Sequence, residues 1–191
     1  MMKNSTKILI AVAGVLLLII IFALSLVGTY NGMVTQRETV DAKLKIIDTQ
    51  LQRRADLIPN LVSTVKGFAA QEKDIMANIT DARAKLAGAQ SVGEKATADN
   101  ELNGALSRLL VVVENYPNLK SDANFRQLSD ELAGTENRIA VSRIDYNDAV
   151  KSYNTKIKRF PTNIFANTFG FEEAEYFEAA EGSENVPQVT F

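Results

Sequence analysis

The sequence predicts an all-α protein in which an N-terminal transmembrane helix is followed by an antiparallel up-and-down four-helix bundle. Two observations lead to this prediction. Residues 8–27 form an apolar run without a charged side chain. Beyond this run, apolar residues recur every three or four positions, which is the period of an amphipathic α-helix, and no segment alternates apolar and polar residues as a half-buried strand does.

The apolar run over residues 8–27 has the length of a membrane span, because twenty helical residues extend about 30 Å, the thickness of a bilayer's hydrocarbon core. Residues 1–7 form a short segment with Lys3, Lys7 and no acidic residue. The positive-inside bias therefore places them in the cytoplasm and the rest of the chain outside it. The alternative is a cleaved signal peptide, for which residues 23–25 (ALS) offer a small-x-small cleavage site.

Composition excludes several kinds of site. The chain has no Cys and no His, which rules out disulfides and thiolate metal sites and removes the commonest metal ligand and general base. We therefore expect no cofactor, no metal and no catalytic residues. The net charge of −2 argues against a nucleic-acid partner. Residues 160–191 contain six Glu and no basic residue, so a near-neutral domain precedes an acidic tail.

Four helices are predicted after the membrane span, over residues 30–54, 56–89, 98–115 and 120–159. In the first, the apolar positions fall four, three and four residues apart, and the other three carry similar stripes. Pro59 would lie in the first turn of the second helix, where its missing N–H is not needed. Short turns between four such helices predict a bundle over residues 28–159.

The turn at residues 54–56 is very short for a chain reversal, so a second arrangement stays open. In this alternative, one kinked helix continues through Pro59 and the domain has three helices. Residues 160–191 follow the bundle as a membrane-proximal aromatic segment and the acidic tail.

The up-and-down order places the turns near Ala55 and Pro117 at the end of the bundle away from the membrane. Two interpretations of this distal end are possible. In one, Arg53 and Arg54 end the first helix and Asp56 begins the second, which complements the helix dipoles. In the other, a polar face binds a partner through Arg53, Arg54, Asn60, Asn115, Tyr116 and Lys120.

The same order places the end of the fourth helix beside the lipid surface, where basic and aromatic residues suit the headgroup zone. The alternative is that the basic residues complement the helix dipole and the phenylalanines cover the base of the bundle. At the C-terminus, Val189 and Phe191 are a candidate peptide ligand for a partner, or belong to a tail without a ligand role. The candidate membrane-surface residues are Lys156, Lys158, Arg159, Phe160 and Phe165.

Two further groups of polar residues receive structural interpretations. We expect Arg138 and Arg143 to form helix-surface pairs with Glu136 and Asp145. We expect bundle packing with local hydrogen bonds, and no ligand, for Tyr146, Asn147, Tyr153 and Asn154.

Several stretches resemble the LemA family of bacterial membrane-anchored proteins. They are YNGMV at 30–34, LQRRADLIPNLVSTVKG at 51–67, ENYPNLK at 114–120, GTENRIAVSRIDYN at 134–147, SYN at 152–154 and FP at 160–161. The resemblance implies a single-pass N-terminal anchor in the bacterial cytoplasmic (inner) membrane and a four-helix bundle. It implies no reaction. Some relatives serve in building magnetosome membranes, and others are encoded near membrane zinc proteases or TPM-domain proteins.

We therefore expect a noncatalytic membrane-anchored scaffold or adaptor of the bacterial cell envelope, with the bilayer and an envelope protein as partners. A membrane protease or a TPM-domain protein is a candidate partner, and a homo-oligomer is possible. The alternatives are a sensor or receptor domain that signals through a partner, or an accessory subunit of a membrane protease. Glu172 and Glu173 form a carboxylate pair, but no phosphate loop, metal spacing or nucleophile accompanies them.

Overall fold

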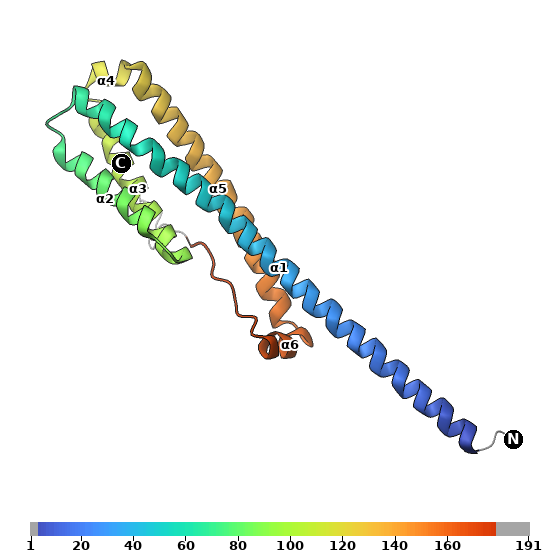
Figure 1. The fold of residues 1–191 in the computed structure, drawn as a ribbon. Helices are drawn as coiled ribbons and strands as arrows, with labels where there is room; N and C mark the ends of the chain where they lie inside the picture. The colour runs from blue at the N-terminus through green and yellow to red at the C-terminus, as the bar shows by residue number, and fades with distance from the viewer. Residues whose placement is uncertain (1–3, 179–191) are drawn as a thin grey trace, which may run out of the picture. The chain divides into compact units, whose positions relative to one another are not determined.

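The computed structural model describes residues 4–178, with the backbone alone for residues 4–8 and 11. This part of the chain is all-helical, with six helices and no strand (Figure 1). It divides into two compact units, which are described in turn. One contains the described residues up to Val40 together with Lys151–Ala174, and the other contains Asp41–Val150 with the described residues from Glu175 onward.

Helix α1 (Asn4–Phe68) is one continuous helix of 65 residues that includes Pro59. The predicted reversal at residues 54–56 is therefore wrong. The alternative is correct in that the helix continues through Pro59, but its domain of three helices is wrong, because four more helices follow within residues 73–158. Proline lacks the N–H that would bond the carbonyl four residues earlier, that of Ala55. Arg83 Nε donates to this Ala55 oxygen over 2.7 Å, so the freed acceptor has a partner and the helix continues.

The first chain reversal lies at residues 69–72, and helix α2 (Lys73–Gly88) follows it. The predicted helix over residues 56–89 is thus divided between the end of α1 and α2. Helix α3 (Val92–Val113) begins six residues before the predicted start at 98. A capping box explains the early start: Ser91 Oγ accepts from Glu94 N, and Glu94 Oε2 accepts from Ser91 N, both at 3.1 Å.

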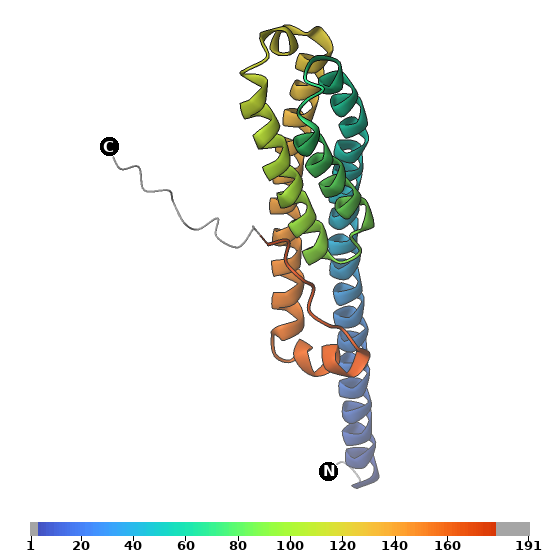
Figure 2. The ribbon, with the colours of Figure 1, turned by 90° about the vertical axis from the view of Figure 1, so that its left-hand side faces the viewer.

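After α3, the short helix α4 (Pro117–Ser121) leads into α5 (Ala123–Lys158). In the unit that contains Asp41–Val150, the segments of α1, α2, α3 and α5 lie side by side and alternate in direction (Figures 1 and 2). Their facing sides are buried and mainly apolar, with Arg54, Asp99 and Thr135 as buried polar residues. Apolar side chains with at most 2% exposure include Ile47, Ile58, Leu61, Val65, Ile79, Leu102, Leu109 and Ile139.

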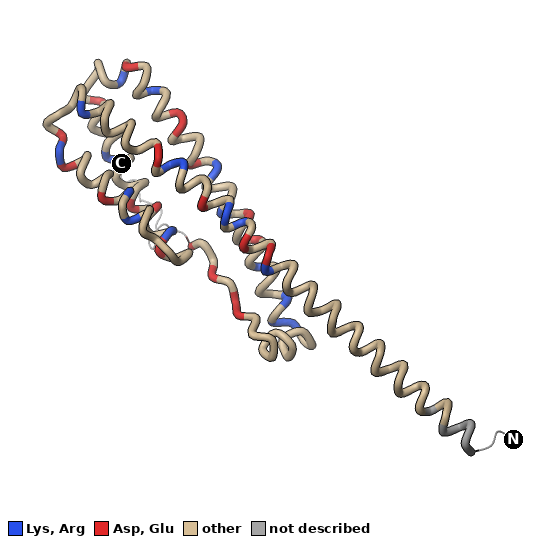
Figure 3. Tube along the Cα trace, viewed as in Figure 1, with Lys and Arg blue, Asp and Glu red and all other residues tan. Residues whose placement is uncertain are grey.

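In the other unit, α1 contains the apolar run, and it is the one helix among the described residues that is long and apolar enough to cross a membrane. Between Lys7 and Arg37, α1 carries no Lys, Arg, Asp or Glu, and Figure 3 shows this long uncharged stretch. Helix α6 (Thr162–Phe169) ends at Gly170, whose φ of 72° is a left-handed conformation that glycine adopts without strain. Beyond Gly170 the chain continues without regular structure to the last described residue.

Candidate functional site

The structure does not bring the six predicted distal residues together. The turn that approaches Tyr116 is that of residues 69–72, and Arg53, Arg54 and Asn60 lie further back along α1. The Tyr116 hydroxyl donates to Glu72 Oε1 over 2.8 Å and accepts from Gln71 Nε2 over 2.7 Å. The bond to the Glu72 carboxylate raises the pKa of Tyr116.

The remaining candidates for the distal face are solvent-facing. Asn60 and Asn115 are exposed. The Lys120 ammonium pairs with Glu114 Oε2 at 2.6 Å, an exposed contact of small energetic value. Val189 and Phe191, the candidate peptide ligand, lie outside the described residues.

Arg54 is a core residue with 2% exposure, so it is not available to a partner at the surface. Its NH1 lies 2.7 Å from Asp99 Oδ1 and 2.6 Å from Glu136 Oε2. Its NH2 donates to Asn103 Oδ1. Arg143 NH2 donates to the second Asp99 oxygen, and Asn103 Nδ2 donates to Glu136 Oε1 over 3.1 Å. Two guanidinium groups and two carboxylates thus balance in a cluster whose centre, Arg54 and Asp99, is buried, while Arg143 and Glu136 at its edge are partly exposed.

This cluster corrects the sequence interpretation that Arg143 and Glu136 form helix-surface pairs. Asp99 is fully buried, and burial raises the pKa of its carboxyl while the guanidinium groups of Arg54 and Arg143 oppose that rise. Buried ion networks of this kind penalise the loss of one member strongly. Asp145, the other acidic residue of that interpretation, pairs with Lys43 of α1 at 2.7 Å. The side chains of both residues are partly exposed.

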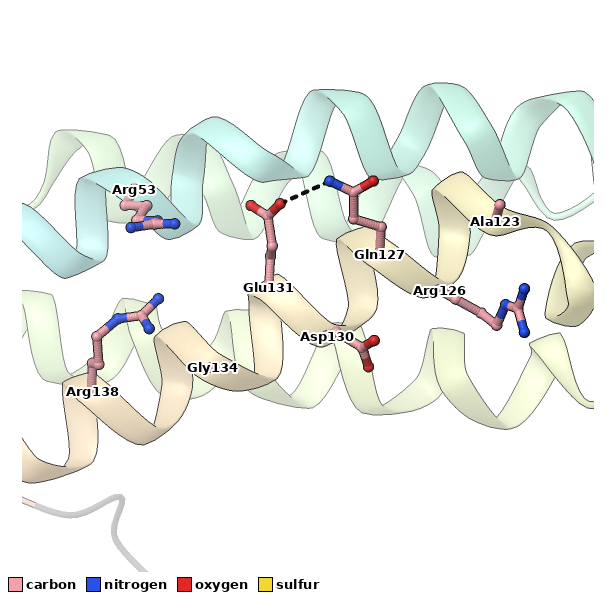
Figure 4. A pocket seen from close by; sticks show the side chains of 8 residues that line it. All are labelled: Arg53, Ala123, Arg126, Gln127, Asp130, Glu131, Gly134 and Arg138. Atoms are coloured by element: carbon pink, nitrogen blue, oxygen red, sulfur yellow. Dashed lines mark hydrogen bonds between the residues drawn. The ribbon is translucent and has the colours of Figure 1, made fainter.

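Arg53 lies at a different surface from the predicted one. It projects from α1 into an open hollow shared with α5, where Arg138 extends toward α1 (Figure 4). Glu131 accepts a hydrogen bond from Gln127 there, over 3.3 Å. Within residues 4–178, the side chains of Arg53 and Arg126 form no hydrogen bond or ion pair. The other residues that line the hollow are Ala123, Asp130 and Gly134.

A second hollow is an apolar cavity of about 180 Å³ between α3 and α5. Leucine side chains of both helices line much of it, among them Leu106, Leu109 and Leu132. Arg54 also lines the cavity, and its buried Nε has no hydrogen-bond partner in the described part of the chain. The lining therefore combines apolar side chains with the unpaired donor of Arg54 and with other polar residues, namely Asn103, Ser107, Ser129 and Glu136.

A Tyr-Asn pair occurs twice on α5, seven residues apart, and each pair holds the extended segment after α6. Asn154 Nδ2 donates to the Ala174 carbonyl and Asn154 Oδ1 accepts from the Ala174 N–H, both over 2.9 Å. Tyr153 donates to the Glu172 carbonyl over 2.9 Å. These tyrosine and asparagine side chains recognise backbone groups, so their bonds are independent of the side chains in the segment.

In the unit that contains Asp41–Val150, Asn147 holds Phe177 in the same way. Its Nδ2 donates to the Phe177 carbonyl over 3.0 Å, and its Oδ1 accepts from the Phe177 N–H over 2.9 Å. Tyr146 donates to the Glu175 carbonyl over 2.7 Å. The Arg143 guanidinium stacks 4.7 Å from the Phe177 ring centre. The tyrosines and asparagines thus have packing and hydrogen-bonding roles, but their partners are distant in sequence.

The membrane-surface candidates are not equally available to lipid. Phe160 is 81% exposed, and Lys158 and Arg159 are exposed as well. Phe165 and Lys156 are only half-exposed. The Lys156 ammonium lies against α1 at Gly32, where a Cβ would collide with it.

Comparison with known proteins gives the family. The sequence model that describes the LemA family matches residues 43–191. The chain belongs to the LemA family. Its relatives include the magnetosome protein MamQ 2 of Paramagnetospirillum magneticum, 32% identical over 84% of this chain and 68% of the relative. MamQ of Magnetospirillum gryphiswaldense is 28% identical over 92% and 73%, and protein LemA of Metamycoplasma hominis is 26% identical over 84% and 74%.

LemA membership and the MamQ relatives, together with the exposed apolar part of α1, indicate a membrane-associated, non-enzymatic protein. None of the three names describes a reaction. In the described residues of this LemA chain, no group of three or more acidic side chains is placed to hold a metal ion. The residues with the most elaborate contacts are instead those that fasten helices and the extended segment to one another.

Proposed function

We propose that this LemA protein is a noncatalytic adaptor of the bacterial cell envelope, anchored in the cytoplasmic membrane by α1 with its N-terminus in the cytoplasm. We also propose that the segments of α1, α2, α3 and α5 form the antiparallel four-helix bundle predicted from the sequence. The ion pairs that join Arg54, Asp99 and Glu136 on three of these helices support this arrangement.

The observation that carries the adaptor proposal is the pair of unbonded guanidinium groups at one hollow. Arg53 of α1 and Arg126 of α5 line the same open surface and form no bond within residues 4–178. Arginine is enriched at protein interfaces because its planar group binds carboxylates in a bidentate manner. An acidic segment of an envelope protein is the partner that this chemistry favours.

Site-specific photo-crosslinking in native membranes tests the proposal. A photoreactive amino acid replaces Arg53 or Arg126 in separate variants of the full chain, and a third variant carries it at the exposed Asn78 of α2 as the control. The same discrete product at both hollow positions and none at Asn78 would support an adaptor. No product, or one pattern at all three positions, would contradict it.

A sensor domain is the second candidate, and the cavity between α3 and α5 favours it. A dry cavity of about 150 Å³ can bind benzene, so about 180 Å³ accommodates a small ring with one hydrogen-bond acceptor for Arg54 Nε. Benzyl alcohol is a suitable probe. Benzyl alcohol should raise the melting temperature with increasing concentration, and Leu106→Trp, which fills the cavity, should abolish this rise. This result would favour a sensor. If the melting temperature does not rise, the sensor proposal is contradicted and the adaptor proposal is the one that stays.

A further inference from the structure

Helix α6 lies beside the point where the apolar run of α1 ends. Tyr30 of α1 packs edge-to-face on Phe169 and Phe171, with ring centres 5.2 and 5.7 Å apart. Tyr30 is three residues beyond Val27, the last residue of the run, which corresponds to about 4.5 Å along a helix. Both aromatic contacts lie within one compact unit of the chain.

Helix α6 also has the orientation of a helix that lies in a membrane surface. It runs across α1 and not along it (Figure 2). If α1 crosses the bilayer, a helix that runs across it at this depth lies near the plane of the headgroups. Tyrosine is enriched at this level of membrane proteins, because its ring is apolar and its hydroxyl is polar.

Large apolar side chains of residues 160–169 are open to solvent in the described structure. Phe160 is 81% exposed, Ile164 54% and Phe169 56%. Only Ala166 of this helix is fully buried. Several large exposed apolar side chains within one short segment indicate a contact with a protein or a membrane, and the neighbouring membrane span favours the membrane.

The charges around α6 largely cancel. Lys158 pairs with Glu173 at 2.7 Å, and Lys156 lies against Gly32 of α1. Arg159 is exposed, and so is Glu172. The set has three basic and two acidic residues, so little net charge is available to attract anionic lipids.

We propose that residues 160–169 form an interfacial foot of this protein. The foot lies in the plane of the bilayer, and Phe160, Ile164 and Phe169 enter the boundary between headgroups and acyl chains. Apolar burial and not charge drives this contact, so it forms on zwitterionic lipid. Because Tyr30 joins the foot to α1, the contact fixes the depth and the rotation of α1 in the membrane. This inference does not depend on the adaptor role.

Tryptophan fluorescence tests the foot, because the natural chain contains no Trp. Full-length Phe160→Trp and Ile164→Trp proteins are reconstituted in nanodiscs of phosphatidylcholine, with and without phosphatidylserine. Phe22→Trp, within the apolar run, is the control for a tryptophan inside the bilayer. Val111→Trp on α3, where the natural side chain is 71% exposed, is the water control.

We expect lipids brominated on their acyl chains to quench Phe160→Trp and Ile164→Trp strongly, close to Phe22→Trp, with emission shifted to shorter wavelength. The quenching should be equal in both lipid mixtures. Quenching at the level of Val111→Trp would overturn the proposal, and so would quenching that requires phosphatidylserine. Ile164→Cys and Val111→Cys provide a second readout, since the chain has no Cys: a water-soluble maleimide should label only Val111→Cys.

Discussion

Asn154 holds the backbone of Ala174 from both sides, with its amide nitrogen bonded to the carbonyl and its amide oxygen bonded to the N–H, each over 2.9 Å. Asn154 is buried, and so is Ala174. A side chain that pairs with both polar groups of one residue fixes an extended segment without requiring a strand partner. Asn147 repeats this arrangement with Phe177.

Asn154→Ala is expected to destabilise the protein by about 1–3 kcal/mol, because it leaves a buried N–H and a buried carbonyl without partners. Amide hydrogen exchange of Ala174 should become faster, and chemical denaturation should report the loss of stability. Asn137→Ala, at an exposed position of the same helix, is the control and should stay within about 0.5 kcal/mol. Unchanged exchange at Ala174 would refute the role of the Asn154 bonds.

Asp99→Ala is expected to cost about 3–5 kcal/mol, because Arg54 and Arg143 lose their shared buried carboxylate. Glu101→Ala in the same helix breaks only the exposed pair with Lys85 and should cost no more than about 1 kcal/mol. Urea denaturation of both variants checks the prediction. Equal losses would show that burial of the cluster has no energetic consequence.

Arg83→Met is expected to cost about 1–3 kcal/mol, because the Ala55 carbonyl loses the donor that replaces the missing N–H of Pro59. The double variant Pro59→Ala/Arg83→Met should recover much of this loss, since alanine restores the helical N–H. A double-mutant cycle measured by thermal unfolding gives the coupling between the two positions. Additive effects would contradict this account of the continuous helix.

The capping box at the start of α3 should make stability depend on pH. Backbone N–H groups of Gln90 and Ser91 bond to Glu94 and lower the pKa of its carboxyl below the ordinary 4.5. A pKa lowered by folding gives stability that is complete above the ordinary pKa and is lost as the pH falls through the folded value.

Glu94→Gln separates this contribution from other titrations, because glutamine can keep the capping box without a charge. The melting temperature of the natural protein should exceed that of Glu94→Gln at pH 7, and the difference should shrink as the pH falls below 4.5. A difference that is constant with pH would be inconsistent with this role of the Glu94 charge.

Reporter fusions test the proposed orientation, which depends on Lys3 and Lys7 preceding the apolar run. Alkaline phosphatase joined after Phe191 should be active, and green fluorescent protein at the same place should be dark. The double variant Lys3→Glu/Lys7→Glu should show a weaker preference for this orientation. The opposite reporter pattern in the natural chain would place the domain in the cytoplasm.

Local sequence patterns predicted the helical class and the apolar anchor segment, because both depend on neighbours three or four positions apart. They also placed the end of the last long helix within one residue of Lys158. The start of α3 could also have been predicted from the sequence, because Ser91 and Glu94 have the spacing of a capping box. The prediction overlooked this signal.

Other features depend on residues that are distant in sequence, and only the tertiary structure decided them. Whether Pro59 interrupts a helix depends on a donor 28 positions away from Ala55 in the chain, Arg83. Whether Arg54 faces solvent or the core depends on Asp99, which supplies the opposite charge from another helix. The chain determines each helix through local periodicity, but burial and partner geometry determine what its polar residues do.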